Sequence, residues 1–283
     1  MGTLYLISTP IGNLDDITFR SRKILENSGI FLAEDTRVFK SLLNHLKIQR
    51  DDKKIISFHD HNDQRRMEEV ISYLDQEHDV YLVSDAGSPM ISDPAYPLVK
   101  RVIESGHDVS SVPGVSSVMV ALELSGLPPS PFTFHGFFPR ENKGRSNAIF
   151  NIFEKGGTHV FFESPHRIMK TLEYLSTQEA DLKLAVCREL TKKFETVYRF
   201  LSSDFEKSRQ KIICKGEFVV VVYFEQKTKN VSVTRKTKKM ALEYLDDAGN
   251  TKLLAKILST LVDEKTKSIY NRLISKNWHH HKE

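Results

Sequence analysis

The chain has 283 residues, of which 40% are hydrophobic and 28% charged, and these proportions suit a folded protein with two hydrophobic cores. It contains no apolar run near the roughly 18 residues of a membrane-spanning helix. Its N-terminus lacks the charged region and following apolar core of a signal peptide. We therefore expect a soluble, cytoplasmic protein without membrane contact. The formal net charge of +4 is too small to predict a nucleic-acid partner by itself.

The first 125 residues form five successive units of strand, loop and helix. This alternation predicts a mostly parallel sheet with helices on both faces. The expected strands are residues 3–8, 30–34, 55–58, 80–84 and 109–112. The first expected helix begins near Asp15, Asp16 and Thr18, and the second covers 38–46. The third runs to about Leu74, the fourth covers 95–104, and the fifth ends at Gly126.

The proline-rich segment 127–131 is the strongest break in the pattern, because each proline restrains its own backbone and that of the preceding residue. We place a domain boundary there, so that the expected domains are 1–127, 128–226 and 227–283. The second domain carries expected strands at 132–137, 159–163, 183–188 and 217–225, with helices between them, which predicts a mixed α/β domain.

The third segment, 227–283, is the basic part of the chain. It holds 13 of the 41 Lys and Arg residues but only 6 of the 37 Asp and Glu residues, which leaves 28 basic and 31 acidic residues in 1–226. Short helices are expected at 238–245, 252–261 and 266–274. A basic helical appendix is typical of contact with a polyanion, although a solvated helical surface has the same composition.

Metal and disulfide sites are not predicted. Cys187 and Cys214 lack a metal-binding spacing, and we expect both to be buried thiols. His59 and His61, with Asp60 and Asp63, form a possible metal-binding set, but an ordinary loop is the favoured interpretation. The terminal histidines 279–281 are expected to form a disordered tail.

Ligands of a parallel sheet bind beyond the carboxyl ends of its strands. The loops at 9–13, 35–37, 85–89 and 113–117 lie at that edge and contain Gly, Pro or short polar residues, although tight turns use the same residue types. The 13 glycines include no G-x-G pair, and no G-x-x-x-x-G-K motif occurs. Hydride transfer and nucleotide hydrolysis are therefore disfavoured, and a cofactor held by several loops is favoured.

Motifs that occur together, in order, strengthen this interpretation. They are residues 9–14, 33–37, 84–89 with 92–94, 113–116, 136–139, 143–145, 162–167, 188–192 and 215–217. In these motifs the chain resembles the ribosomal RNA small-subunit methyltransferase I family over essentially its whole length. The chain departs from the common family residues at four positions: Val115 replaces Pro, Ser117 replaces Ala, Ser88 replaces Thr, and Cys187 replaces Ala. These changes are small, so we still expect the cofactor to bind.

The resemblance implies a class III, tetrapyrrole-methylase-like α/β fold with two α/β domains, a cofactor cleft between them, and the helical appendix. It implies transfer of a methyl group from S-adenosyl-L-methionine to the 2′-hydroxyl of a cytidine in the decoding region of 16S ribosomal RNA, in the 30S ribosomal subunit, by a homodimer. The cofactor residues that it implies are Pro10, Ile11, Gly12, Asp85, Ala86, Gly87, Pro89, Ser116, Ser117, Phe162 and Glu163.

A ribose hydroxyl is a poor nucleophile while protonated, so a carboxylate that accepts its proton is expected. Asp35 is our first candidate and Glu189 the second, while the alternative is that Glu34 and Asp35 only cap the following helix. The candidates for RNA binding are Arg37, Arg140, Lys143, Arg145, Arg167, Arg188 and Lys192, of which we expect only a part to touch RNA.

Two other functions remain open. One is methylation of a small molecule such as a tetrapyrrole precursor, against which the basic appendix argues. The other is a ribosome-assembly factor that binds RNA but has lost catalysis. The intact loops at 10–12 and 85–87 argue against that.

Overall fold

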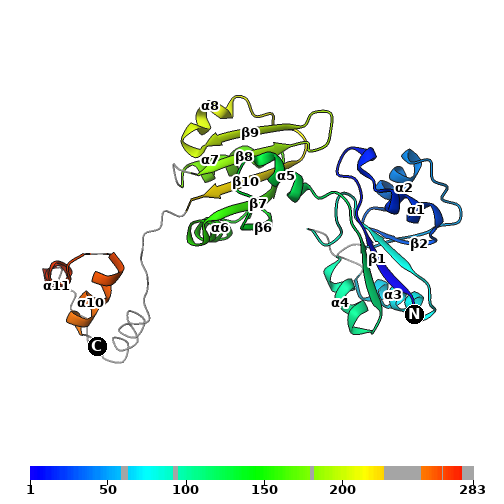
Figure 1. Cartoon of the computed structure of the whole chain (residues 1–283), viewed down its shortest axis with the longest axis horizontal. Helices are drawn as coiled ribbons and strands as arrows, with labels where there is room; N and C mark the ends of the chain where they lie inside the picture. Colours follow the sequence, from blue (N-terminus) through cyan, green and yellow to red (C-terminus); the bar gives the residue numbers. More distant parts are fainter. Residues whose placement is uncertain (59–62, 92–94, 179–181, 226–249, 263, 276–283) are drawn as a thin grey trace. The chain divides into compact units, whose positions relative to one another are not determined.

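A computed structural model describes residues 1–58, 63–91, 95–178, 182–225, 250–262 and 264–275. The chain divides into two compact units, residues 1–226 and 227–283, and two five-stranded sheets lie in the described part of the first unit (Figure 1). The loop with His59 and His61, the motif at 92–94, the expected helix at 238–245 and the histidines at 279–281 lie outside the described residues.

The first sheet is entirely parallel, as predicted. Its strands lie in the order β3-β2-β4-β1-β5. They are β1 (Thr3–Ile7), β2 (Ile30–Ala33), β3 (Lys54–Ser57), β4 (Val80–Val83) and β5 (Asp108–Val112), and each lies within a residue of its expected bounds.

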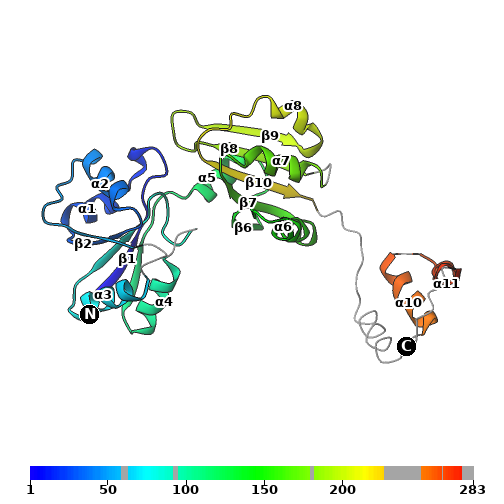
Figure 2. The same ribbon diagram turned by 180° about the vertical axis from the view of Figure 1, so that it is seen from behind.

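Helices cover both faces of this sheet, which confirms the predicted layers (Figures 1 and 2). The helices α1 (Phe19–Asn27) and α2 (Thr36–His45) pack on one face through Leu25, Phe39 and Leu43. On the other face lie α3 (Asp63–Asp75) and α4 (Tyr96–Glu104), which bury Leu74 and Leu98. These buried side chains recur at helical spacing, so the hydrophobic effect fixes which side of each helix meets the sheet.

The start of the first helix differs from the expectation. Asp15 and Asp16 lie in a separate 3₁₀ turn, η1 (Leu14–Asp16), where the Asn13 side chain accepts a hydrogen bond from the Asp15 N–H. The helix α1 begins only after Thr18, whose hydroxyl accepts a hydrogen bond from the Ser21 N–H. Two successive capping residues therefore divide a segment in which a single helix start is expected.

The second sheet is mixed, as expected, with the strand order β6-β7-β10-β8-β9. Its strands are β6 (Phe132–Phe137), β7 (Gly157–Glu163), β8 (Lys183–Arg188), β9 (Thr196–Leu201) and β10 (Phe218–Phe224). One face is covered by α6 (Asn142–Lys155), α7 (Ile168–Ser176) and α8 (Phe205–Arg209), with the short 3₁₀ turn η2 (Ser202–Asp204) before α8. No strand is expected at β9, which is an edge strand whose side chains are all at least partly exposed.

The other face of the second sheet is covered by α5 (Ser117–Ser125), which precedes the proline-rich segment. Val118, Ala121 and Leu122 pack against this face, and the Arg199 guanidinium of β9 donates to the Ser125 carbonyl at 3.1 Å and to the Leu124 carbonyl. A helix from the first part of the chain thus packs on the second sheet. The domain boundary at residue 127 stays a prediction.

The second unit contains α10 (Thr251–Val262) and α11 (Thr266–Ser275), close to the two expected helices. Ala255, Ile257 and Ile269 are its buried apolar residues among those described. None of the described helices has both the length and the apolar character needed to cross a bilayer.

The two cysteines differ in environment, and both are free thiols. Cys187 is fully buried beneath α5, as expected, and burial raises its pKa to about 12. The expectation of a buried thiol is wrong for Cys214, which is exposed in the segment before β10. That position follows the short helix α8 and belongs to no strand, so the apolar residues around it in the sequence do not imply burial.

Candidate active site

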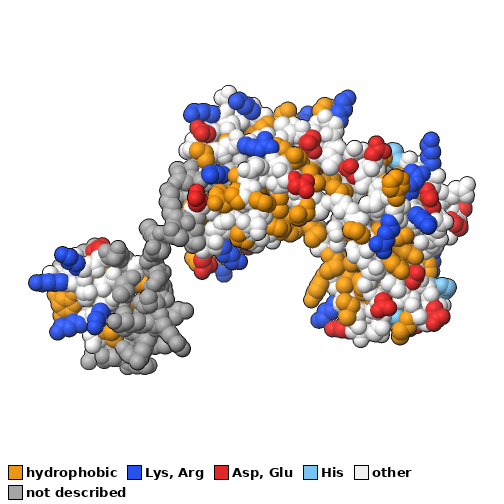
Figure 3. All heavy atoms as spheres, viewed as in Figure 1, with side chains coloured by type: hydrophobic (Ala, Val, Ile, Leu, Met, Phe, Trp, Pro, Cys, Tyr) orange, Lys and Arg blue, Asp and Glu red, His pale blue; other side chains and the backbone are white. Residues whose placement is uncertain are grey.

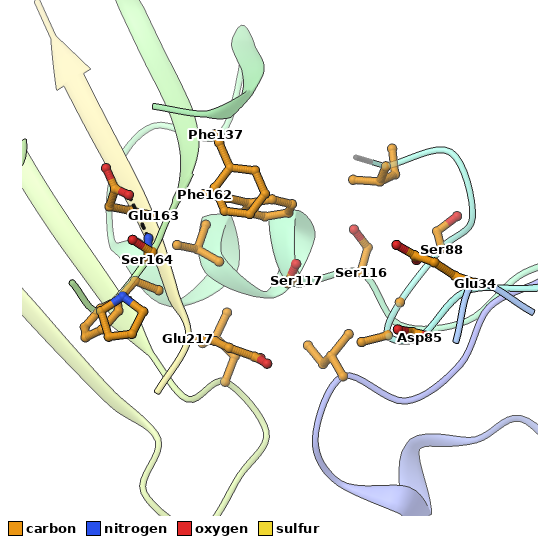
Figure 4. Close-up of a pocket in the computed structure, with 18 residues that line it drawn as sticks. Glu34, Asp85, Ser88, Ser116, Ser117, Phe137, Phe162, Glu163, Ser164 and Glu217 are labelled. Atoms are coloured by element: carbon orange, nitrogen blue, oxygen red, sulfur yellow. Dashed lines mark hydrogen bonds between the residues drawn. The ribbon is translucent and has the colours of Figure 1, made fainter. Parts of the chain in front are cut away.

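A cavity of about 490 Å³ opens at the carboxyl end of the first sheet, where the second sheet meets it (Figure 4). This volume is within the range of small-molecule sites. The lining residues are Ile11, Glu34, Asp85, Ala86, Gly87, Ser88, Ile91, Ser116, Ser117, Phe137, Phe162, Glu163, Ser164, Pro165, Leu190, Glu217, Phe218 and Val219. The loops after β1, β2, β4 and β5 therefore come together, as the parallel topology predicts.

Backbone hydrogen bonds join the loops after β1 and β4. Thr9 N–H donates to the Gly87 carbonyl at 2.9 Å and Gly87 N–H donates to the Thr9 carbonyl at 3.0 Å. Ser84 reinforces the turn, because its hydroxyl donates to the Gly87 carbonyl at 2.7 Å. Gly87 has φ +82°, a conformation that strongly favours glycine, and a Cβ there would lie 3.3 Å from the Ile11 side chain. The wall of the cavity therefore depends on a glycine at this position.

Gly12 serves a contact between the two sheets rather than the cavity wall. A Cβ on Gly12 would lie 2.3 Å from Lys192 Cγ and 3.1 Å from the Leu190 carbonyl oxygen. Beside it, Asn13 N–H donates to the Thr191 hydroxyl at 3.1 Å. The lack of a side chain on Gly12 thus lets the loop after β1 pack closely on the turn after β8.

The Asp35 side chain caps helix α2. Its Oδ1 accepts from the Arg37 N–H at 2.8 Å, and its Oδ2 pairs with the Arg37 guanidinium at 2.6 Å. The hydrogen bonds and charge of Arg37 hold the pKa of the Asp35 carboxyl well below its usual range. Asp35 does not line the cavity, whereas the preceding residue, Glu34, does.

Asp85 is a carboxyl of the cavity lining whose pKa is raised. Burial raises it, while a hydrogen bond from the Asp35 N–H to Asp85 Oδ1 at 3.0 Å partly opposes the effect. Asp85 thus connects the loop after β4 with the start of α2. In Figure 4, Asp85, Ser88 and Glu34 lie together on one side of the cavity.

Glu163 is a buried carboxylate on the opposite side of the cavity, and its hydrogen bonds go to groups of the second sheet and its helix α7. Its Oε1 accepts from the Ser164 N–H at 2.7 Å, and its Oε2 accepts from the Thr171 hydroxyl at 2.6 Å. Arg167 pairs with the same carboxylate at 3.4 Å. Satisfied in this way, Glu163 holds the end of β7 against α7.

Glu189, the second candidate for proton acceptor, lies in the turn after β8 and outside the cavity lining. Burial raises its pKa, but the hydrogen bond from the Glu217 N–H and the Lys192 ammonium outweigh that effect and keep the pKa below its usual value. Its backbone has φ +52°, and a Cβ on Gly216 would lie 2.4 Å from its carboxyl group. These contacts are those of a residue that shapes the turn.

Most of the residues predicted for the cofactor meet in the cavity. Those that line it are Ile11, Asp85, Ala86, Gly87, Ser116, Ser117, Phe162 and Glu163, whereas Pro10, Gly12 and Pro89 do not. The lining residues that the prediction left out are Glu34, Ser88, Ile91, Phe137, Ser164, Pro165, Leu190, Glu217, Phe218 and Val219. All of these except Ile91, Phe218 and Val219 lie within the motifs quoted above. The positions of the motifs therefore indicate most of the cavity lining.

The seven basic candidates fall into three sets. Arg167 and Arg188 serve the protein's own backbone: Arg167 donates to the Phe138 carbonyl at 2.6 Å, and Arg188, only 7% exposed, donates to the Lys215 carbonyl at 2.6 Å. Lys192 bridges two carboxylates at 3.0 Å, and Arg145 stacks over the Tyr174 ring at 5.7 Å. The remaining three, Arg37, Arg140 and Lys143, are exposed. This placement favours structural roles for Arg167 and Arg188.

Comparison with known proteins connects this site to a family. Residues 3–206 match the model of the Tetrapyrrole (Corrin/Porphyrin) Methylases. A ribosomal RNA small subunit methyltransferase I from Halalkalibacterium halodurans is 41% identical over 78% of this chain and 75% of its own length. The protein of the same name from Neisseria meningitidis serogroup B is 35% identical over 97% and 94%. The chain belongs to the ribosomal RNA small subunit methyltransferase I family.

Membership of this methyltransferase family confirms the resemblance drawn from the motifs. Solved structures agree on the fold: a diphthine synthase superposes with a TM-score of 0.61 at 14% identity, over 79% of this chain and 90% of its own. A uroporphyrin-III-C-methyltransferase from Thermus thermophilus gives 0.52 at 18% identity, over 79% and 94%. The predicted tetrapyrrole-methylase-like fold is therefore confirmed.

Proposed function

We propose that this chain transfers a methyl group from S-adenosyl-L-methionine to the 2′-hydroxyl of a cytidine in the decoding region of 16S ribosomal RNA. The observation that carries the proposal is the cavity itself, in which eight of the predicted cofactor residues meet in a chain whose relatives are named ribosomal RNA small subunit methyltransferases. The proposal includes a cytoplasmic homodimer, as the family resemblance implies.

The lining side chains fit S-adenosyl-L-methionine by their chemistry. The carboxylates of Glu34, Asp85 and Glu217 complement the positive sulfonium and ammonium groups of that molecule. The apolar side chains of Ile11 and Phe162 suit its adenine ring, and the N-terminus of α5, which begins at Ser117, favours a carboxylate. When bound, the cofactor supplies an electrophilic methyl group on a sulfur that leaves uncharged.

The task of the protein is to hold the ribose hydroxyl in line with that methyl group. Orienting two reactants supplies roughly 7 to 11 kcal/mol in favourable cases, so the shape of the cavity is the largest expected contribution. Close packing at two glycines supports this shape: a Cβ would lie 3.3 Å from the Ile11 side chain at Gly87 and 2.3 Å from Lys192 Cγ at Gly12, beside the cavity.

Asp35 stays our candidate for the group that accepts the ribose proton. Its low pKa makes it a weak base while Arg37 is paired with it. The Arg37 side chain is 89% exposed, so an RNA phosphate can compete for its guanidinium. Removal of that partner raises the pKa of Asp35 toward its ordinary value, which couples the arrival of RNA to the strength of the acceptor.

Exposed basic residues on both units support an RNA substrate. Arg140 lies just before α6 and Lys143 in its first turn, and the described part of the second unit exposes Lys252, Lys256, Lys265 and Lys267. Figure 3 shows Lys and Arg side chains on the visible face of that unit. Phosphate contacts of this kind position RNA without reading its sequence.

Replacing Arg140 or Lys143 with alanine is expected to weaken binding to 30S subunits and to reduce its salt dependence, by about 0.7 to 0.9 in the slope of log K against log salt for each true phosphate contact. Binding measured between 50 and 200 mM salt tests this expectation. Lys100→Ala on α4, which removes an exposed lysine paired with Glu104 at 3.7 Å, is the matched control. An unchanged slope in the Arg140 and Lys143 variants would remove these residues from the interface.

The decisive experiment is incubation of the protein with labelled S-adenosyl-L-methionine and unmodified 30S subunits, followed by nuclease digestion and mass spectrometry of the nucleosides. We expect the label in 2′-O-methylcytidine. Labelling of a porphyrinoid substrate but not of the subunits would show a small-molecule methyltransferase. RNA binding without calorimetric binding of the cofactor would show an assembly factor.

A further inference from the structure

Phe137 is an exposed aromatic residue at the edge of the cavity. Its side chain is 57% exposed, whereas that of its neighbour Phe138 is 1% exposed and belongs to the core of the second sheet. Phe137 also lines the cavity together with Phe162. A large apolar ring that faces both a ligand site and solvent marks a position where a ligand can cover it.

An irregularity in β6 places Phe137 at the cavity. Phe134 pairs with Val160, and Phe137 pairs with Phe162, so three steps along β6 match two steps along β7. The extra residue is accommodated at Gly136, which has φ +70°. Such bulges occur next to active sites and redirect a side chain.

Regular pairing would put the ring on the wrong face of the sheet. In regular pairing, Gly136 would lie opposite Phe162, and Phe137 would lie on the same face of the sheet as His135. On that face the His135 ring stacks against the Phe161 ring, with centroids 4.5 Å apart. With the bulge, Phe137 instead lies beside Phe162, and their ring centroids are 5.7 Å apart at 72°. Because the two rings meet edge to face, Phe162 does not stack flat on Phe137.

The surroundings of this ring distinguish it from Phe162. Phe162 is half-buried and is also in contact with Phe134, with ring centroids 4.9 Å apart. Phe137 is the more exposed of the pair and borders the solvent side of the cavity. Figure 4 shows the two rings side by side, across the cavity from Ser88 and Glu34. The inner ring of Phe162 and the outer ring of Phe137 suit a site in which a cofactor and a substrate bind next to each other.

We propose that Phe137 is a stacking platform for the nucleobase of the nucleotide whose ribose is methylated. The inference rests on the proposed function, since it assigns the RNA half of the same site. Single-stranded RNA is recognised by aromatic side chains on which unstacked bases lie, and an enzyme that modifies a nucleotide must hold it outside the helical stack. A base held on Phe137 would bring its attached ribose to the cofactor.

Three substitutions test this proposal. Phe137→Leu keeps an apolar side chain but removes the flat ring, and it is expected to lower kcat/KM for unmodified 30S subunits about 10-fold or more. Phe137→Tyr keeps the ring and is expected to stay within about 3-fold of the wild type. The calorimetric Kd for S-adenosyl-L-methionine is expected to be unchanged in both. Phe150→Leu, which removes a ring that is 64% exposed on α6, is the matched control and should behave as the wild type.

The outcomes separate this inference from the function on which it rests. Normal kinetics in Phe137→Leu, or an equal loss in Phe150→Leu, would overturn the stacking role. A loss that appears in the Kd for the cofactor would assign the ring to the cofactor's adenine instead. Failure of the wild type to label the subunits would contradict the proposed function as well. An unchanged Tm in each variant excludes a folding defect.

Discussion

Replacing Gly87 with valine is expected to raise the Kd for S-adenosyl-L-methionine at least about 100-fold, as measured by calorimetry. The residue has φ +82°, where a β-branched side chain is strongly disfavoured, and its Cβ would already lie 3.3 Å from the Ile11 side chain. The added methyl groups would also enter the cavity that Gly87 lines. Strain and obstruction therefore act together at this position.

Gly106→Val is the matched control for this experiment. Gly106 has the same φ of +82°, but a Cβ there would meet no atom within 4 Å, and the residue follows α4 at the other end of the sheet. Both variants carry the backbone strain, so both should lose stability in thermal unfolding. Only Gly87→Val should lose the cofactor, and retention of normal affinity there would place the cofactor elsewhere.

Replacing Asp35 with asparagine is expected to lower kcat at least about 100-fold, because general base catalysis contributes a factor of that size or more. Asparagine is as good an N-cap as aspartate, so α2 should keep its start. The Kd for the cofactor should stay unchanged, since Asp35 does not line the cavity. Single-turnover kinetics with saturating 30S subunits measures the effect on the chemical step.

Glu189→Gln provides the comparison for Asp35→Asn. The amide oxygen can still accept from the Glu217 N–H, as Oε1 of Glu189 does at 3.0 Å, so the turn after β8 should persist. We expect turnover in this variant to fall far less than in Asp35→Asn. Full turnover in Asp35→Asn would leave Asp35 with its capping role alone, and a larger loss in Glu189→Gln would make Glu189 the acceptor.

The first sheet was predictable because its signals are local. Each strand is a short apolar run followed by a turn and an amphipathic helix, and the carboxyl-edge rule then places the loops of Ile11, Asp85 and Ser116 together. The edge strand β9 was not predictable in this way, because only one side of it has a neighbouring strand and none of its side chains is fully buried.

What the sequence does not reveal about the site depends on three-dimensional detail. Phe137 reaches the cavity only through the bulge at Gly136, and regular alternation along β6 would place it on the other face. Arg188 has the side chain of a phosphate ligand, but it is buried and bound to two backbone carbonyls. Neither register shifts nor burial of a long charged side chain can be inferred from local sequence.

The cavity is lined by residues from both ends of the first unit's sequence, and this affects when it can form during biosynthesis. Ile11 and Val219 share one cavity although more than 200 positions separate them along the chain. Translation releases the N-terminal segments first, so the first sheet can assemble while β10, at the centre of the second sheet, is still inside the ribosome. A nascent chain therefore has no complete cavity until synthesis has passed this strand.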